Sequence, residues 1–142
     1  MEIRTPNTQA EWDAYYHLRW EVLRKPWNQP VGSEMDADEN SFYHVAAFEG
    51  EKILGVGCLK MINDQEAQIR FMAVANSLQR KGVGVSLMNA LEVQAFSRRA
   101  SKVVLHAREI AVPFYEYCGY SIIEKSYLLF DSIQHYLMSK EI

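Results

Sequence analysis

The sequence predicts an α/β domain of the α+β kind, in which helices cover a twisted mixed sheet. Three observations predict this class. A glycine-rich turn over 79–84 joins a strand-like segment to a helix-like one, a further strand follows that helix, and hairpin-like pairs of strands lie on either side of the unit. A strand–helix–strand unit forms a right-handed crossover between parallel strands, whereas hairpins pair strands antiparallel. The sheet is therefore expected to be mixed.

The first half of the chain predicts a helix, a loop and a hairpin. Residues 8–24 carry apolar side chains at helical spacing, with Thr8 as a suitable N-cap, and a proline follows the helix. Turn-forming and acidic residues over 26–40 predict a loop or a short irregular helix. Strands over 42–49 and 53–61 then flank a short Glu-Gly-Glu connection, which predicts a hairpin.

The second half begins with a strand over 67–75 and, after the glycine turn, a helix over 83–100. A short, very apolar strand over 102–107 follows it, and a short helix over 112–118 stops at Gly119. Two last strands complete the predicted sheet, over 122–130 and 134–139.

Composition limits the function. With 142 residues, 49% of them hydrophobic, the chain is expected to form one domain over 1–142 with a substantial core. A net charge of −3 argues against nucleic acid as a partner, because a phosphate backbone requires a basic surface. No apolar stretch approaches the ~20 residues that span a bilayer, and no secretory signal is present, so we expect a cytoplasmic protein. Cys58 and Cys118 are too few for a disulfide framework.

The turn Gln79-Arg80-Lys81-Gly82-Val83-Gly84 predicts a phosphate site. A glycine turn that opens a helix presents free backbone N–H groups and the positive end of the helix dipole. Two other phosphate loops do not fit, since there is no Gly-Lys-Ser/Thr ending and Leu87 stands where a third glycine is needed. The turn alone is equally compatible with a helix start that binds nothing.

The turn also resembles the Gln/Arg-x-x-Gly-x-Gly/Ala motif of the GCN5-related N-acetyltransferases, which use acetyl coenzyme A. Residues 112–120 resemble a second motif of this family, Phe-Tyr-x-x-x-Gly-Phe/Tyr, at the family's spacing. Leu105-His106-Ala107 and Ile133-Gln134-His135 are similar to small bacterial ElaA-like members. The resemblance implies one N-acetyltransferase domain with about six to seven strands and about four helices, and no metal.

The resemblance further implies a coenzyme site on the strand end and the turn. The strand end would pair its backbone with the pantetheine arm, and the turn would hold the pyrophosphate, with Arg80 and Lys81 adding positive charge. The implied coenzyme-binding residues are Met72, Ala73, Val74, Gln79, Arg80, Lys81, Gly82, Val83, Gly84 and Tyr115.

Two catalytic residues are expected, Tyr115 and His106. Tyr115 matches the family's tyrosine near the thioester sulfur, and a phenol with a pKa of about 10 can protonate a thiolate without being ionised at neutral pH. Histone-type members have a glutamate as general base where this chain has Gln68, which cannot accept a proton. We take His106 as the base, because histidine titrates near neutrality. Glu66, His135 and His44 are the other candidate residues for this role, and a chain of water molecules is a further alternative.

The acceptor is expected near the first helix and the loop after it. Arg19 and Arg24 could pair with a carboxylate, acids such as Glu34 could attract an amine, and His135 could approach from the last strand. Both charges together suit an amino acid or a small zwitterion, although an ordinary solvated loop also fits.

The sequence therefore predicts an N-acetyltransferase that acts on a primary amine of a small molecule by direct attack on acetyl coenzyme A. Two alternatives stay open. The chain could be a non-catalytic acyl coenzyme A sensor, since the usual glutamate is missing, or it could acetylate a peptide amino terminus. Aromatic residues of the first helix fit either the core or a homodimer surface.

Overall fold

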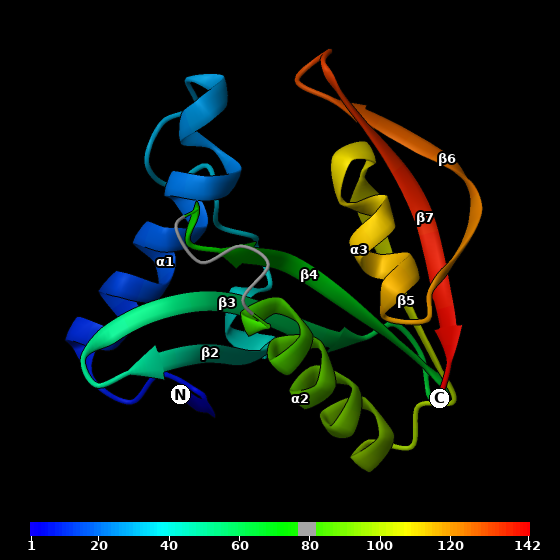
Figure 1. Ribbon diagram of the computed structural model, residues 1–142, viewed down its shortest axis with the longest axis horizontal. Coiled ribbons are helices and arrows are strands. Elements are labelled where there is room, and N and C mark those ends of the chain that lie inside the picture. Colours follow the sequence, from blue (N-terminus) through cyan, green and yellow to red (C-terminus); the bar gives the residue numbers. More distant parts are fainter. Residues whose placement is uncertain (77–81) are drawn as a thin grey trace.

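The computed structural model describes residues 1–76 and 82–142 and contains one seven-stranded mixed sheet in the order β1-β2-β3-β4-β5-β7-β6 (Figure 1). Neighbouring strands are antiparallel except β4 and β5, which are parallel. This confirms the mixed sheet. The strands are β1 (Glu2–Arg4), β2 (Tyr43–Glu49), β3 (Lys52–Met61), β4 (Glu66–Val74), β5 (Lys102–Arg108), β6 (Ser121–Leu129) and β7 (Ile133–Glu141).

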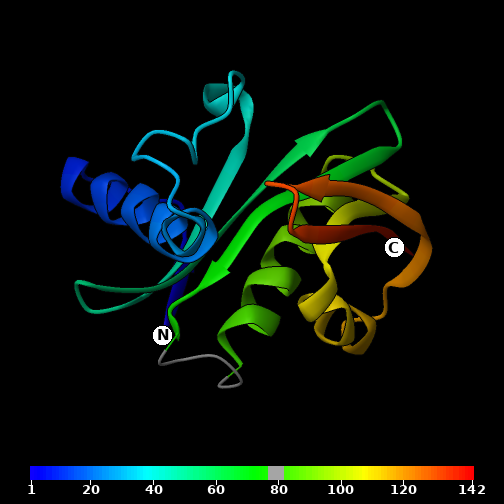
Figure 2. The same cartoon turned by 90° about the horizontal axis from the view of Figure 1, so that it is seen from above.

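Helix α1 (Gln9–Leu23) covers one face of the sheet (Figure 2). Its start has the predicted cap: the Thr8 side chain accepts a hydrogen bond from the Glu11 N–H, and the Glu11 carboxylate accepts one from the Thr8 N–H. Its buried side chains pack against small and aromatic residues of β2, β3 and β4. The short helices η1 (Lys25–Trp27) and η2 (Glu39–Ser41) lie in the loop that follows.

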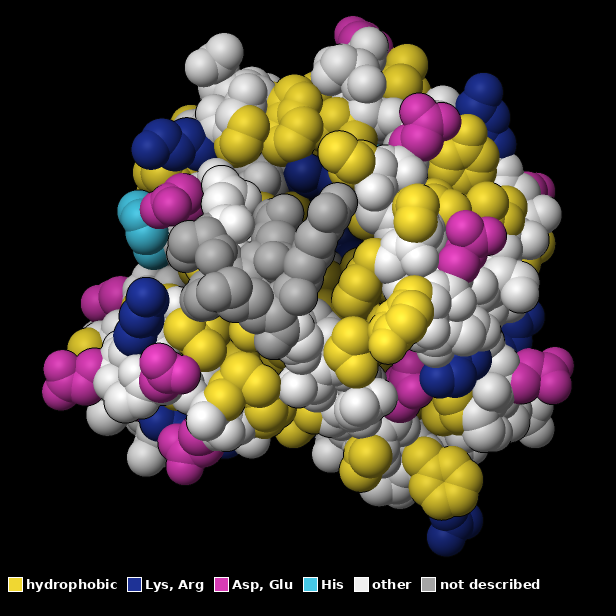
Figure 3. All heavy atoms as spheres, viewed as in Figure 1, with side chains coloured by type: hydrophobic (Ala, Val, Ile, Leu, Met, Phe, Trp, Pro, Cys, Tyr) yellow, Lys and Arg dark blue, Asp and Glu magenta, His cyan; other side chains and the backbone are white. Residues whose placement is uncertain are grey.

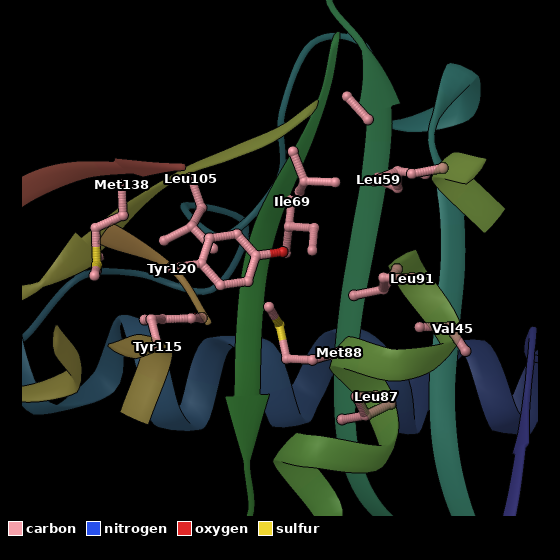
Figure 4. Close-up of a cluster of buried hydrophobic side chains, with 14 of the residues drawn as sticks. Val45, Leu59, Ile69, Leu87, Met88, Leu91, Leu105, Tyr115, Tyr120 and Met138 are labelled. Atoms are coloured by element: carbon pink, nitrogen blue, oxygen red, sulfur yellow. The ribbon is translucent and has the colours of Figure 1, made fainter. Parts of the chain in front are cut away.

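Helices α2 (Val83–Ser97) and α3 (Val112–Tyr117) cover the opposite face, and the short helix η4 (Glu109–Ala111) precedes α3. In Figure 4, Leu87 and Leu91 of α2 lie beside Val45 and Leu59, whereas Tyr115 of α3 lies beyond β4 with other side chains of the C-terminal strands. The described residues therefore contain three α-helices, where about four were expected.

The parallel pair β4–β5 is short. Register contacts join Glu66–Gln68 to Lys102–Val104 and then stop, although β4 continues to Val74 and β5 to Arg108. A β-bulge accompanies this divergence, because Phe71 and Met72 together lie opposite Gly57 of β3. Phe71 has a φ of 53°, in the left-handed region that non-glycine residues seldom adopt. The two strands thus diverge at mid-sheet and leave a gap.

A buried polar cluster supports the bulge on the α1 side. The Arg19 guanidinium is fully buried, donates to the Glu39 carboxylate at 2.7 Å and to the Tyr15 hydroxyl at 3.2 Å, and lies 4.4 Å from the centre of the Phe71 ring. His44 completes the cluster, 2.8 Å from the same hydroxyl. These contacts tie α1 to η2 and to the bulge.

The sequence did not predict β1, whose three residues pair with β2. Three residues are too few to show the alternation that identifies a strand. The other predicted helices and strands are confirmed, and their ends differ from the prediction by at most three residues.

Glu39→Gln should destabilise the protein by about 3 kcal/mol, because it leaves the charge of Arg19 buried without a counter-ion. The free energy of unfolding in urea measures this. Glu21→Gln removes the exposed partner of His17 and should change that free energy by less than about 1 kcal/mol. Equal effects of the two substitutions would show that the Arg19–Glu39 pair is not critical to the fold.

Candidate functional site

A cavity of about 550 Å³ occupies the gap between β4 and β5. Its walls come from these two strands, from β3, β6 and β7, from the C-terminal end of α1 and from α3. This volume is in the range of small-molecule sites. The lining residues are Leu23, Arg24, Lys60, Gln68, Ile69, Arg70, Phe71, Met72, Leu105, His106, Arg108, Ala111, Tyr115, Tyr127, Leu129 and His135.

The cavity has two chemically different halves, because strand residues alternate between the faces of the sheet. On the side of α2 and α3, its walls include Ile69, Leu105 and Tyr115, which belong to the apolar core. On the side of α1 they include Arg70 and His106, which lie one position further along β4 and β5. One half is therefore apolar and the other polar.

The edge of β4 that faces the gap has no strand partner after Gln68. Met72, Ala73 and Val74 of this segment were expected to contact the coenzyme. Of these three, Met72 lines the cavity. Ala73 packs toward α1, and Val74 packs against the core under α2. Their backbones pair with β3 only, which leaves the other edge open for an extended ligand.

Gly82 and Gly84 differ in their structural roles. Gly82 is the N-cap of α2 with a φ of 82°, and a Cβ there would meet no atom of the described residues within 4 Å. No side chain of the described residues caps this helix, so the N–H groups of its first turn remain available to an anion. Gly84 instead permits close packing, since a Cβ there would lie 2.9 Å from the Phe114 ring. Gln79, Arg80 and Lys81 lie outside the described residues.

Tyr115 lies in the apolar half of the cavity and is 9% exposed. Its ring contacts Phe114 and Tyr120 edge-on. Its hydroxyl makes no hydrogen bond with any residue that the structure describes. Burial raises the pKa of Tyr115 well above its ordinary value, so the phenol keeps its proton throughout the physiological range.

His106 lies in the polar half. Its Nδ1 is 3.0 Å from the Ser126 hydroxyl, and its ring is 5.2 Å from that of Tyr127. Burial, and next the charge of Arg70, lower the pKa of His106 below 6.5, so the imidazole is neutral at pH 7 and can accept a proton.

His135 stacks on Tyr127 at 4.4 Å and also lines the cavity, with its Nδ1 3.0 Å from the Ile133 carbonyl oxygen. A bulge in β6 sets this arrangement, because Ser126 and Tyr127 together lie opposite His135.

Of the other candidates for a general base, His135 lines the cavity, whereas His44 and Glu66 lie outside it. His44 belongs to the buried cluster around Arg19, where its Nε2 is 2.8 Å from the Glu39 carbonyl oxygen. Glu66 lies at the start of β4, next to Lys102, where the two strands are still paired. Gln68 does line the cavity.

The structure corrects two of the residues expected to bind the acceptor. Arg19 is fully buried and paired with Glu39, so it does not reach the cavity. Glu34 is also buried, and its carboxylate accepts a hydrogen bond from the Gly32 N–H. Both residues hold the loop after α1 in place. Arg24 and His135 do line the cavity.

Sequence reasoning missed three basic residues of the cavity wall: Lys60, Arg70 and Arg108. The alternation of β-strands offered a signal for two of them. Arg70 follows Gln68 by two positions and Arg108 follows His106 by two, which places each pair on one face of the sheet.

Comparisons with known proteins identify the family. The model of the acetyltransferase (GNAT) family matches residues 12–120. The uncharacterized N-acetyltransferase YjcF of Bacillus subtilis (strain 168) is 36% identical over 129 residues, covering 91% of each chain. The chain belongs to the GNAT family. It is therefore an acetyltransferase that uses acetyl coenzyme A.

Solved GNAT structures show the same fold. An aminoglycoside 6'-N-acetyltransferase complexed with coenzyme A superposes with a TM-score of 0.84 at 18% identity, covering 99% of this chain and 97% of that one. Escherichia coli ElaA gives a TM-score of 0.81 at 19% identity, with the same coverage. At such identities the likeness shows the fold alone.

No group of three or more His, Cys, Asp or Glu side chains within residues 1–76 and 82–142 is arranged to hold a metal ion. No helix in the described part of this GNAT chain is long and apolar enough to cross a bilayer.

Gly82→Glu should weaken the binding of acetyl coenzyme A by about 10-fold or more, because it adds strain at a positive φ and a negative charge at the start of α2. Isothermal titration calorimetry measures the affinity. Gly50→Glu is the matched control, since Gly50 has a φ of 61°, equally open surroundings and a place in the β2–β3 turn. Equal affinity of wild type and Gly82→Glu would remove this turn from the coenzyme site.

Proposed function

We propose that this GNAT enzyme transfers an acetyl group from acetyl coenzyme A to the primary amine of a small molecule. The observation that supports this is the position of Tyr115 and His106 on the walls of one cavity, in its apolar and polar halves. A thioester and an amine that enter from opposite faces of the sheet would meet between a proton donor and a proton acceptor.

The proposed reaction is a direct transfer. The amine nitrogen gives its proton to His106 and attacks the thioester carbonyl carbon, which forms the C–N bond and a tetrahedral oxyanion. Backbone N–H groups on the open edge of β4 stabilise this oxyanion. The C–S bond then breaks, and the thiolate takes the proton of Tyr115. Solvent returns a proton from His106 to Tyr115, so the products are the amide and free coenzyme A.

Enclosure of the cavity favours a small acceptor over a peptide. Arg108 of β5 donates a hydrogen bond to the Leu23 carbonyl oxygen at 2.9 Å and lies 4.4 Å from the Trp27 ring. These contacts connect the C-terminal end of α1 to β5 across the gap. A peptide would need an open groove at this position.

The structural neighbours differ in their names: two are aminoglycoside 6'-acetyltransferases, and one is an Ard1 from Thermoplasma volcanium. They are 18% to 19% identical to this chain, so its acceptor has to be inferred from its own residues. We also propose that residues 1–142 act as one N-acetyltransferase domain in the cytoplasm. The homodimer stays a prediction.

Tyr115→Phe should lower kcat by about 100-fold and leave the affinity for acetyl coenzyme A within about twofold, because only the proton donor is lost. Thiol release gives the rate and calorimetry gives the affinity. Tyr117→Phe, two residues further along α3 and 80% exposed, should change neither. Unchanged turnover in Tyr115→Phe would remove the phenol from the mechanism.

The rate should fall as the pH drops below about 6.5, because protonation of His106 removes the base. Its lowered pKa places this loss on the acid side, and no loss is expected between pH 7 and 8. His106→Gln should lower kcat/KM by about 100-fold and abolish this dependence. His17→Gln changes an exposed histidine of α1 and should keep the wild-type profile. An acid limb that persists in His106→Gln would assign the base elsewhere.

The sensor hypothesis predicts a different outcome. A sensor would bind acetyl coenzyme A but release no thiol with any amine, whereas the proposed enzyme releases thiol in proportion to the amide formed.

A further inference from the structure

We infer that the acceptor carries an anionic group, a carboxylate or a phosphate, in addition to its amine. This inference rests on the proposed function and specifies its substrate class. Four of the lining residues are cations, Arg24, Lys60, Arg70 and Arg108, and no aspartate or glutamate among the described residues lines the cavity. The net charge of the whole chain is −3, so this local excess of positive charge does not follow from composition.

Three of the four cations form no salt bridge, and the acids that act on them from outside the cavity are Glu34, near Arg24, and Asp36, near Lys60. Arg70 pairs with Asp36 at 2.6 Å, whereas Arg24, Lys60 and Arg108 form no salt bridge with any described residue. The guanidinium groups of Arg24 and Arg108 are instead anchored to backbone carbonyl oxygens, at 2.9 to 3.1 Å. These bonds fix the side chains and leave other N–H donors for a ligand. In the surface view, basic side chains lie recessed among apolar ones (Figure 3).

The four cations lie on the acceptor side of the sheet. Arg24 is the C-cap of α1, Arg108 contacts the end of α1, and Arg70 pairs with Asp36 of the loop after α1. Lys60 of β3 lies opposite Gln68, which is on the same face of β4 as Arg70. The start of α2 lies on the opposite face, where Gly84 packs against Phe114. The coenzyme phosphates are expected at the start of α2, so these cations are left to recognise the other substrate.

A bound anion would also relieve repulsion within the cluster. Burial lowers the pKa values of Arg24 and Arg108, and the charges of neighbouring arginines lower them further. Planar guanidinium groups bind carboxylate and phosphate oxygens in pairs. A polycationic amine would instead add like charges to a partly desolvated site.

His106 and the cations are close enough for one small molecule to contact both. Arg108 follows His106 by two residues on the same face of β5, about 7 Å along the strand. The charge of Arg70 influences His106 directly. The acceptor amine would therefore lie at His106 and its anionic group among the guanidinium groups.

The test uses amines that share a two-carbon or three-carbon frame and differ in their second group. β-Alanine carries a carboxylate, phosphoethanolamine a phosphate, ethanolamine a neutral hydroxyl and 1,3-diaminopropane a second cation; tyrosine and tyramine repeat the comparison on a larger frame. The kcat/KM of the better anionic amine should exceed that of its neutral partner at least 10-fold and that of the diamine at least 100-fold. The comparison of β-alanine with phosphoethanolamine shows whether the site prefers a carboxylate or a phosphate. Equal or faster acetylation of ethanolamine, tyramine or the diamine would overturn the inference.

The substitution Lys60→Glu tests whether the basic residues of the cavity wall bind the anionic group of the acceptor. Lys60 makes no hydrogen bond or salt bridge with a described residue, and its Nζ lies 6.0 Å from the centre of the Phe42 ring, so its replacement should lower the free energy of unfolding by no more than about 1 kcal/mol. The substitution should raise KM for the anionic amine at least 10-fold, and Lys60→Arg should restore it. Lys52→Glu makes the same charge change at the exposed start of β3 and should leave KM unchanged. A KM that is unaffected by Lys60→Glu would count against the inference.

A binding measurement separates failure of the inference from failure of the proposed function. If no amine releases thiol while acetyl coenzyme A binds, the proposed function is wrong. The inference is then decided by calorimetric titration of the coenzyme-loaded protein with N-acetyl-β-alanine and with its neutral amide. Preference for the acid that is lost in Lys60→Glu supports it, and equal binding overturns it.

Discussion

The divergence of β4 from β5 is the constraint on which the site depends. Parallel strands that separate after three paired residues leave one open edge and one cavity at the centre of the sheet. The left-handed backbone of Phe71, in the bulge of β4, costs about 1–2 kcal/mol, and the surrounding structure has to compensate for it. Arg19 contributes by covering the Phe71 ring from the buried cluster under α1.

The same divergence separates two kinds of chemistry. Residues that alternate along β4 and β5 present apolar side chains toward α2 and α3 and polar side chains toward α1. Tyr115 therefore lies where burial keeps a phenol protonated, and His106 lies where burial and Arg70 keep an imidazole neutral. At neutral pH the two groups are thus in the forms that the proposed proton donor and proton acceptor require.

The acids of the loop after α1 and the cations of the cavity wall have different partners. Three acids of the loop after α1 are occupied: the carboxylates of Glu34 and Glu39 accept hydrogen bonds from backbone N–H groups, Glu39 also pairs with Arg19, and Asp36 pairs with Arg70. Their role is to fix the loop that borders the cavity. Three cations of the cavity wall, Arg24, Lys60 and Arg108, form no salt bridge with a described residue, and no described acid lines the cavity, so an overall acidic chain presents a basic site there.

The sequence by itself determined the order of the elements after β1, the Thr8 cap, the mixed sheet and the family, because periodicity, capping residues and glycine turns act over a few neighbouring positions. It also indicated Tyr115 and His106 through motifs. Only the tertiary structure decided that Arg19 is buried while Lys60, Arg70 and Arg108 line the cavity. Those contacts join α1, β3, β4 and β5 across long separations in sequence, and a bulge of one residue in β4 sets which side chains meet.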